Sequence, residues 1–255
     1  MAEPLPPGPE TVLGKTMKVL GAFTADDAVL GFTDLQLRTE LPKATLHRLL
    51  GDLVGARLLE KVDGAYRLSR FVFELGMRAS VERTLLEVAI PFLEELYERT
   101  HETVHLGVRE GHEVVYVAKM GGHRQVTSPS RLGGRMPLHA TAIGKALLAW
   151  APEEVREDVL AGRLRRCSPR TIVNRAVLRR QLDDVLERGV AFEHEESAVG
   201  VTCVAAPVLG DYDEVLAGVS VTGPVGRFEP IRCASAVRAA AAGVAATLAR
   251  RSRLR

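Results

Sequence analysis

The chain has 255 residues, of which 46% are hydrophobic and 26% are charged. This length allows two ordinary domains or one large one, and the composition is typical of a soluble globular protein. The net charge is +2, but four arginines lie within residues 250–255, so the rest of the chain carries −2. The total charge therefore does not indicate a nucleic-acid partner, and such a role has to rest on a local basic face.

Cysteine usage and the two ends of the chain indicate the compartment. The three cysteines include no C-x-x-C pair, and their odd number argues against a disulfide framework. Residues 1–10 are proline-rich and lack the basic start and apolar run of a signal peptide. The alanine-rich stretch 234–249 is interrupted by Arg238, which favours a terminal helix over a membrane span. We expect a cytoplasmic protein without membrane contact.

The first segments of the chain predict three helices. Apolar residues recur with helical spacing from Val12 to Phe23. Thr33 to Gln36 fits a capping box, in which Thr33 caps a short helix that ends near Thr39. Proline suits a first helical turn, so the next helix is expected from Pro42 to Val54. Its buried face is predicted to consist of Leu46, Leu49, Leu50 and Leu53.

A hairpin is expected directly after these helices. Asp63-Gly64 separates two strand-like runs, 58–62 and 65–68, and Asp-Gly between such runs is a strong hairpin signal. The order of helix, helix, tight turn, helix and hairpin predicts a winged helix-turn-helix. In that motif the second helix of the turn pair enters the DNA major groove and the hairpin forms the wing.

The side of the 42–54 helix that faces away from its leucines carries donors for phosphates and base edges. From Arg38 to Arg70 there are seven Lys/Arg against four Asp/Glu. A basic face on an isolated helix is equally compatible with plain solvent exposure, but the neighbouring helix and wing favour contact with double-stranded DNA. The predicted DNA-binding residues are Arg38, Lys43, Ala44, Thr45, His47, Arg48 and Arg67.

The remaining chain mixes helices and strands. Helices are expected at 71–80, 84–100, 140–150, 152–160, 174–188 and 230–250. Strands are expected at 103–108, 114–119, 190–194, 201–209 and 215–222. Strands in the middle with helices before and after them indicate an α/β or α+β sensor-type domain, so the predicted fold class is α+β with two domains.

Several strings together resemble the IclR family of bacterial transcription regulators. They are LPKATLHRLL at 41–50, GRMPLHATA at 134–142 with GKA at 144–146, EE at 195–196, GV at 200–201, CVAAPV at 203–208 and VSVTGP at 219–224. The likeness runs in the family's order from about Val12 to Leu248. Glu40 departs from the pattern, because the family often has glycine there, and a positive φ at that position would be costly for glutamate.

The resemblance implies a winged helix-turn-helix domain at 1–70, a linker helix at 71–83 and a GAF-like effector-binding domain at 84–255. It further implies homodimers, or pairs of dimers, on pseudo-palindromic operators, with RNA polymerase as a partner if the protein activates. Small organic acids or aromatic catabolites are the implied effectors. The matching pocket positions are Met136, Ala142, Ile143, Glu193, Val201, Cys203, Ser220 and Thr222. An anionic effector requires a protonated Glu193 or a ligand donor beside it.

One motif suggests an enzyme instead. His101 to His105 reads H-E-x-x-H, a zinc-protease signature that requires both histidines on one helix face. The predicted helix ends near His101 and a strand begins at Thr103, so the two imidazoles would diverge. We therefore predict no catalytic residues, metal or cofactor. A zinc hydrolase and a DNA-binding protein without any effector are the alternatives to a ligand-responsive, nucleoid-associated regulator.

Overall fold

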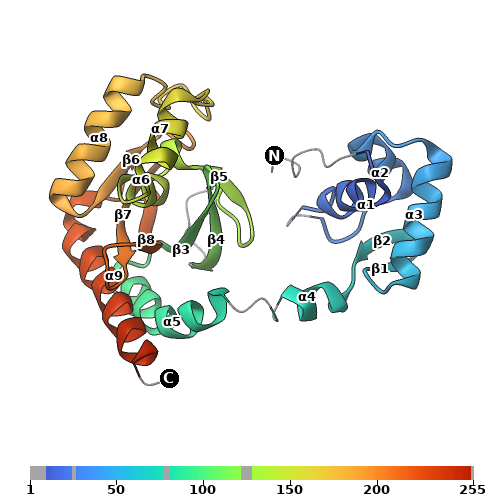
Figure 1. Cartoon of the computed structure of the whole chain (residues 1–255), viewed down its shortest axis with the longest axis horizontal. Helices are drawn as coiled ribbons and strands as arrows, with labels where there is room; N and C mark the ends of the chain where they lie inside the picture. The colour runs from blue at the N-terminus through green and yellow to red at the C-terminus, as the bar shows by residue number, and fades with distance from the viewer. Residues whose placement is uncertain (1–9, 25–26, 77, 79–80, 122–127, 254–255) are drawn as a thin grey trace. The chain divides into compact units, whose positions relative to one another are not determined.

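The computed structural model describes residues 10–24, 27–76, 78, 81–121 and 128–253 (Figure 1). The chain divides into two compact units, Met1–Ser80 and Val81–Arg255. The finer division into domains at 1–70 and 84–255 with a linker helix at 71–83 stays a prediction. A helix does follow the hairpin, at Arg70–Gly76, and the next one begins at Val81.

The N-terminal unit contains the expected helices and hairpin. Its elements are α1 (Val12–Gly21), α2 (Phe32–Thr39), α3 (Lys43–Gly55), β1 (Leu59–Val62), β2 (Ala65–Leu68) and α4 (Arg70–Gly76). Asp63 and Gly64 both have positive φ, at 49° and 83°, and join β1 to β2 in an antiparallel hairpin. Leucines of α2, α3 and β1 form the centre of the core, all of them buried: Leu35, Leu46, Leu49, Leu50, Leu53 and Leu59.

The start of α2 differs from the expectation. Gly31 is the N-cap, and the carboxylate of Asp34 accepts a hydrogen bond from the Gly31 backbone N–H at 3.1 Å. The capping box predicted from Thr33 and Gln36 is therefore wrong, because the helix begins earlier and Thr33 lies within its first turn. At the other end, Glu40 adopts the left-handed region with φ 56°. This is the costly conformation anticipated for glutamate at that position.

The C-terminal unit is built on one six-stranded sheet whose described pairings are all antiparallel. The strand order is β5 (Arg135–Pro137), β4 (Glu113–Met120), β3 (Thr103–Glu110), β8 (Val215–Pro224), β7 (Val201–Leu209) and β6 (Ala191–His194). The helical elements are α5 (Val81–Thr100), η1 (Leu138–Ala140), α6 (Ala142–Ala149), α7 (Glu153–Ala161), α8 (Arg175–Arg188) and α9 (Pro230–Ser252).

Each face of this sheet carries its own core. On one face, alternate strand residues such as Val104, Val204 and Val221 pack with α5 and α9, which lie side by side (Figure 1). On the other face, Tyr116 and Cys203 belong to a second core with α6 and α8. Successive strand residues point to opposite faces, so side chains on β3, β7 and β8 alternate between the two cores.

Among the described residues, α9 is the one helix long and apolar enough to cross a membrane by length and composition. Its inner face is buried against the sheet and α5, through Val237, Ala240, Ala241 and Val244. The same criterion is met by core helices of globular proteins, and these contacts make α9 a packing helix of the C-terminal unit.

Candidate DNA-binding face and effector cavity

Helix α3 has two different faces. Its four leucines are at most 3% exposed, whereas Lys43, Ala44, His47 and Arg48 are exposed and Thr45 is half-buried. Neither Lys43 nor Arg48 forms a hydrogen bond or ion pair with any described residue, so both cations are available to an external anion. The face predicted to contact DNA is thus a solvent-facing set of donors on a helix held in place by its opposite side.

The two remaining arginines of the predicted set are already paired. The guanidinium of Arg38 donates to Asp27 at 2.6 and 3.0 Å and to the carbonyl of Ala22 at 2.8 Å. These hydrogen bonds from Arg38, with its positive charge, lower the pKa of the Asp27 carboxyl far below its usual range. Arg67 donates to Glu60 across the wing at 2.9 and 2.7 Å. Both arginines hold local structure, and their contact with DNA stays a prediction.

The C-terminal unit encloses a cavity between the sheet and the start of α6, called the effector cavity below. Its volume is about 20 Å³. Seven of the eight predicted pocket residues line it, namely Ala142, Ile143, Glu193, Val201, Cys203, Ser220 and Thr222. Met136 is not among the lining residues and lies instead in the core beneath α6. The other lining residues are His105, Tyr116, Ser128, Ser130, Thr141 and Ser197.

His105 connects three sides of this cavity. It lies on β3 with 1% exposure, and its Nε2 is 2.8 Å from the hydroxyl of Ser130. Its Nδ1 is 3.4 Å from the hydroxyl of Ser220 and 3.5 Å from that of Thr222. Burial, assisted by the charge of Lys119, lowers the pKa of His105 to about 3. His105 is therefore neutral at physiological pH and can both donate and accept a hydrogen bond.

Acidic and basic groups meet at the end of β6. The Glu193 carboxylate accepts hydrogen bonds from the backbone N–H groups of Glu196 at 2.7 Å and Ser197 at 2.9 Å. Burial nevertheless raises the pKa of Glu193 to about 7. Next to it, Lys145 and Glu196 form an ion pair at 2.5 Å with side chains 1% and 6% exposed. The ammonium of Lys145 also donates to the carbonyl of Phe192 at 3.2 Å, so α6 is fastened to β6.

The cavity contains no activated nucleophile among its described residues. Burial raises the pKa of Cys203 to about 12, and the Thr222 hydroxyl lies 3.0 Å from its sulfur. Burial also raises the pKa of the Tyr116 phenol above its usual value. A thiol in these surroundings stays protonated, whereas a nucleophilic cysteine needs a lowered pKa. The lining groups are suited to hydrogen bonding with a ligand.

Three glycines let α6 approach the sheet closely. A Cβ on Gly144 would lie 2.1 Å from the carbonyl oxygen of Leu138. A Cβ on Gly107 would meet Val114 at 2.7 Å, and one on Gly218 would meet Ile143 at 3.0 Å. The hydroxyl of Thr141 caps α6 by accepting from the Gly144 N–H at 3.0 Å. The cavity wall is therefore set by the absence of side chains at these positions.

The lining residues missed from the sequence are those that distant segments bring together. The sequence predicts His105 on a strand face. Its alternation with Val104 and Leu106 places it on the opposite face of β3, which is also buried because the sheet is covered on both sides. Tyr116 follows the same alternation on β4. Ser128, Ser130, Thr141 and Ser197 lie in or next to loops, where no period marks a buried side chain.

The H-E-x-x-H string does not form a zinc site. His101 follows the last residue of α5 with φ 51°, and Glu102 is paired with Arg227 at 2.8 Å. His105 lies on β3, and α5 ends at Thr100, so the helix that this motif requires ends before the motif's first residue. No cluster of three metal-binding side chains occurs within the described ranges. His101 is exposed and contacts Tyr97, whereas His105 is buried in the effector cavity, so the two side chains have different surroundings.

One unit is a winged helix-turn-helix, and the other is an α+β fold with a small internal cavity lined by hydrogen-bonding groups. This combination defines the class of ligand-responsive DNA-binding regulators. The family described as IclR helix-turn-helix domain matches residues 12–63. The family described as bacterial transcriptional regulator IclR C-terminal matches residues 77–246. The chain belongs to the IclR family of bacterial transcription regulators, and it is a ligand-responsive transcription regulator and not a hydrolase.

Relatives with known roles agree. The transcriptional regulator KdgR of Escherichia coli K12 is 34% identical over 229 residues, which cover 88% of this chain and 87% of KdgR. XynR of the same strain is 34% identical, over 87% of this chain and 89% of XynR. The crystal structure of an IclR homolog from Microbacterium hydrocarbonoxydans, complexed with 4-hydroxybenzoate, is 31% identical with a TM-score of 0.86. The match covers 93% of this chain and 99% of the chain in that crystal structure.

Proposed function

We propose that the exposed face of α3 reads a pseudo-palindromic operator through Lys43, Ala44, Thr45, His47 and Arg48. The support is the contrast between the buried leucines of this helix and its unpaired cations, since donors in a major groove have to be free of other partners. Arg38 and Arg67 would add backbone contacts from α2 and the wing. The observation that carries the proposal is the exposed, unpaired Arg48.

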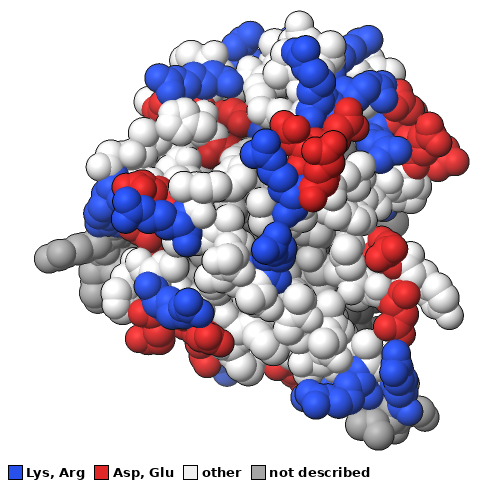
Figure 2. All heavy atoms as spheres, turned by 90° about the vertical axis from the view of Figure 1, so that its left-hand side faces the viewer, with Lys and Arg blue, Asp and Glu red and all other residues white. Residues whose placement is uncertain are grey.

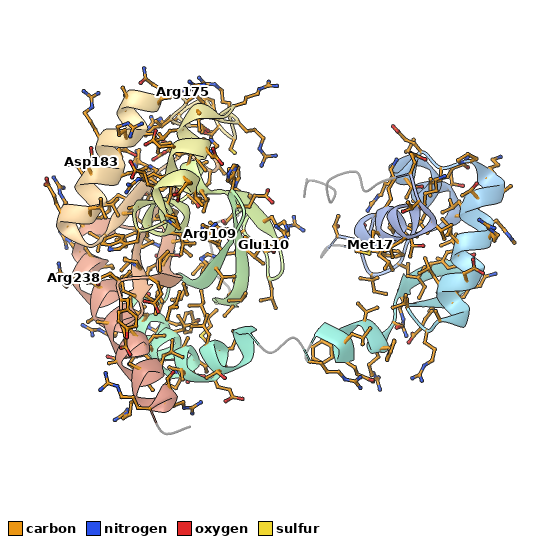
Figure 3. The ribbon with its side chains drawn as sticks, in the orientation of Figure 1. Met17, Arg109, Glu110, Arg175, Asp183 and Arg238 are labelled. Atoms are coloured by element: carbon orange, nitrogen blue, oxygen red, sulfur yellow. The ribbon has the colours of Figure 1, made fainter. Side chains whose placement is uncertain are left out.

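A second copy of the chain is the proposed partner of the N-terminal unit. On α1, Val12, Leu13 and Met17 are 64%, 71% and 44% exposed (Met17 is labelled in Figure 3), and Phe73 on α4 is 68% exposed. Such large apolar side chains on one small unit are typical of an interface. A twofold pairing would present two α3 helices to the two half-sites of an operator. Pairing of two dimers and contact with RNA polymerase belong to the same proposal.

The proposed effector is a small organic acid or aromatic catabolite bound in the effector cavity of a GAF-like domain. The 4-hydroxybenzoate complex of the Microbacterium homolog supports this class. A volume of about 20 Å³ holds one water, so an effector has to displace the cavity walls. A ligand that binds only the opened form shifts the protein toward that form, which is how occupancy would reach the DNA-binding unit.

Operator binding tests the α3 assignment. We expect Arg48→Ala to weaken binding to DNA from upstream of the protein's own gene about 5- to 150-fold, measured by fluorescence anisotropy. The matched control is Arg180→Ala, which removes an exposed arginine from α8 and should leave affinity unchanged. Both variants should unfold at the wild-type temperature. Equal affinities of Arg48→Ala and wild type would overturn the recognition face.

The effector assignment is tested by ligand-induced stabilisation. A panel of organic acids that includes 4-hydroxybenzoate is screened by thermal shift, because a ligand specific to the native state raises the melting temperature. Ser220→Ala and Glu193→Gln should reduce the shift of any acid that binds, while Arg180→Ala should not. Acids whose shifts are the same in all three variants bind elsewhere, and such a result would contradict the effector cavity.

A further inference from the structure

A second concave surface lies at the edge of the sheet, between β6 and the start of α9. Its volume is about 450 Å³. This volume falls within the range of about 300–1,000 Å³ that small-molecule sites occupy. The surface, called the β6–α9 groove, is lined by Arg188, Phe192, Glu193, His194, Thr202, Val225, Phe228, Glu229, Pro230 and Ile231.

The groove and the effector cavity share strand β6, and Glu193 lines both of them. Phe192 pairs with Val204, which belongs to the core under α9, whereas Glu193 pairs with Cys203, which lines the effector cavity. Side chains alternate along a strand, so Phe192 and His194 face the groove side. One four-residue edge strand therefore forms a wall of both sites.

Most of the groove wall is apolar. Phe192, Val225, Phe228 and Pro230 are packed into or around it, and Ile231 is 67% exposed on the first turn of α9. Figure 2 views the α8–α9 side of the C-terminal unit and shows a broad uncharged area between groups of basic and acidic side chains. An exposed isoleucine beside aromatic side chains gains burial when an apolar body covers it.

The charged groups at the rim favour an anion. The guanidinium of Arg188 has no hydrogen-bond or ion-pair partner in the parts of the chain that the structure describes. Its backbone is fixed, because Arg238 of α9 donates to the Arg188 carbonyl at 3.3 Å (Arg238 is labelled in Figure 3) and Gly189 ends α8. Two acids line the groove, and both have partners. Glu229 pairs with Arg232 at 2.6 Å, and Glu193 is 2% exposed and accepts hydrogen bonds from the backbone N–H groups of Glu196 and Ser197.

We propose that the β6–α9 groove is a second ligand site, which takes a small amphiphilic anion with an apolar body and one carboxylate or sulfonate. The apolar body lies against Phe228 and Ile231, and the anionic group pairs with Arg188. Because Lys145 of α6 donates to the carbonyl of Phe192, an occupant of this groove contacts the strand that α6 holds. The site adjoins the effector cavity at Glu193, its other lining residues are separate, and it does not depend on the proposed effector.

The test uses the full-length protein and the fluorescent aromatic sulfonate 1-anilinonaphthalene-8-sulfonate. We expect a saturable fluorescence increase from one site per chain. Arg188→Glu, which places a negative charge at the rim, should weaken this binding at least about tenfold. The matched control Arg180→Glu changes an exposed arginine on the same helix outside the groove and should leave the affinity unchanged.

Two further variants locate the dye. Ile231→Asp should weaken its binding as Arg188→Glu does, whereas Leu13→Asp on the apolar face of α1 should not. Arg188→Glu and Ile231→Asp are each checked for a wild-type melting temperature and for unchanged operator affinity, so that failure of the groove is separate from failure of the α3 assignment.

Three results would overturn the proposal. They are no saturable fluorescence increase with wild type, equal effects of Arg188→Glu and Arg180→Glu, and loss of binding in Leu13→Asp. A change of oligomer mass in Arg188→Glu by light scattering would also overturn it, because the groove would then hold a second copy of the chain.

Discussion

The DNA-binding face of α3 and the effector cavity place their polar groups in opposite physical settings. On α3, Lys43 and Arg48 are exposed and have no partner among the described residues. In the cavity, His105 and Glu193 are at most 2% exposed and are hydrogen-bonded to neighbours. The α3 side chains are therefore free to be replaced without loss of fold. The cavity residues stabilise the same structure that they offer to a ligand.

The largest effect is expected when the buried ion pair of Lys145 and Glu196 is broken. Lys145→Met keeps much of the side-chain volume but leaves the Glu196 carboxylate buried without its partner. We expect the free energy of unfolding to fall by about 3–5 kcal/mol, measured by urea denaturation. Lys145→Met combined with Glu196→Gln should recover a large part of this loss, because no uncompensated charge remains. A loss of the same size in the double variant would show that packing, and not charge, dominates.

The same contrast explains what the sequence could predict. The period of the α3 leucines and the Asp63-Gly64 turn are local, and each was visible within about ten residues. The pairing of Lys145 with Glu196 joins residues 51 positions apart, and no local pattern indicates it. Seven cavity residues were predicted through the family resemblance and not through physical reasoning. Periodicity alone left them indistinguishable from ordinary core residues.

Local reasoning also failed where two local signals competed. Thr33 fits the sequence pattern of an N-cap because its hydroxyl can accept a backbone N–H. In the structure the N-cap is Gly31, and the carboxylate of Asp34 accepts a hydrogen bond from the Gly31 backbone N–H. At His105 two local patterns also disagree. The H-E-x-x-H motif indicates a metal ligand on a helix, whereas the alternation of β3 indicates a strand residue.

The second test uses pH. Glu193 has a pKa of about 7 in the folded protein, above its ordinary value, because of burial. The folded state therefore binds this proton more tightly than the unfolded state, and the resulting stability is present below about pH 4.5 and is lost as the pH rises through 7. The whole effect is at most about 3 kcal/mol. We expect Glu193→Gln to be more stable than wild type at pH 8.5 and to lose that advantage at pH 5.

The groups around Glu193 determine how that experiment is interpreted. Hydrogen bonds from the backbone N–H groups of Ser197 and Glu196 lower its pKa, and the charge of Glu196 raises it. Lys145 and Cys203 lie on the neighbouring α6 and β7. Only the difference between wild type and Glu193→Gln isolates the residue, because other titrations cancel in that difference. If the melting temperatures of both proteins depended on pH in the same way, the raised pKa of Glu193 would be contradicted.

The third test makes one substitution in each region. Gly144→Ala places a Cβ 2.1 Å from the Leu138 carbonyl oxygen, and we expect a loss of about 1–3 kcal/mol from the forced shift of α6. Gly51→Ala on α3 meets nothing within 4 Å, and alanine favours helix over glycine. It should stabilise the N-terminal unit by about 0.5–1 kcal/mol. The free energy of unfolding of both variants is measured in denaturant. If both substitutions raised it, or both lowered it, the contrast between an open helix face and a tightly packed cavity wall would be contradicted.

The smallest expected effect belongs to Arg38, the residue where the two settings meet. It is part of the predicted DNA-binding set, yet its guanidinium holds Asp27 and the carbonyl of Ala22. The Arg38 side chain is 39% exposed, so removal of the pair by Arg38→Ala should cost about 1 kcal/mol or less. We expect Arg38→Ala to lower stability slightly and operator affinity less than Arg48→Ala does.

Asp27→Asn is the control that separates the two roles of Arg38. It removes the partner charge and keeps the cation, so it should reproduce the stability loss of Arg38→Ala while operator affinity stays at the wild-type value or rises. The Asp27 contribution should also disappear in acid, because a carboxyl with a lowered pKa stabilises the fold above its unfolded pKa and loses that effect as the pH falls. If Arg38→Ala weakened operator binding as strongly as Arg48→Ala at unchanged stability, the ion pair with Asp27 would have to open on DNA. Arg38 would then belong with the free cations of α3.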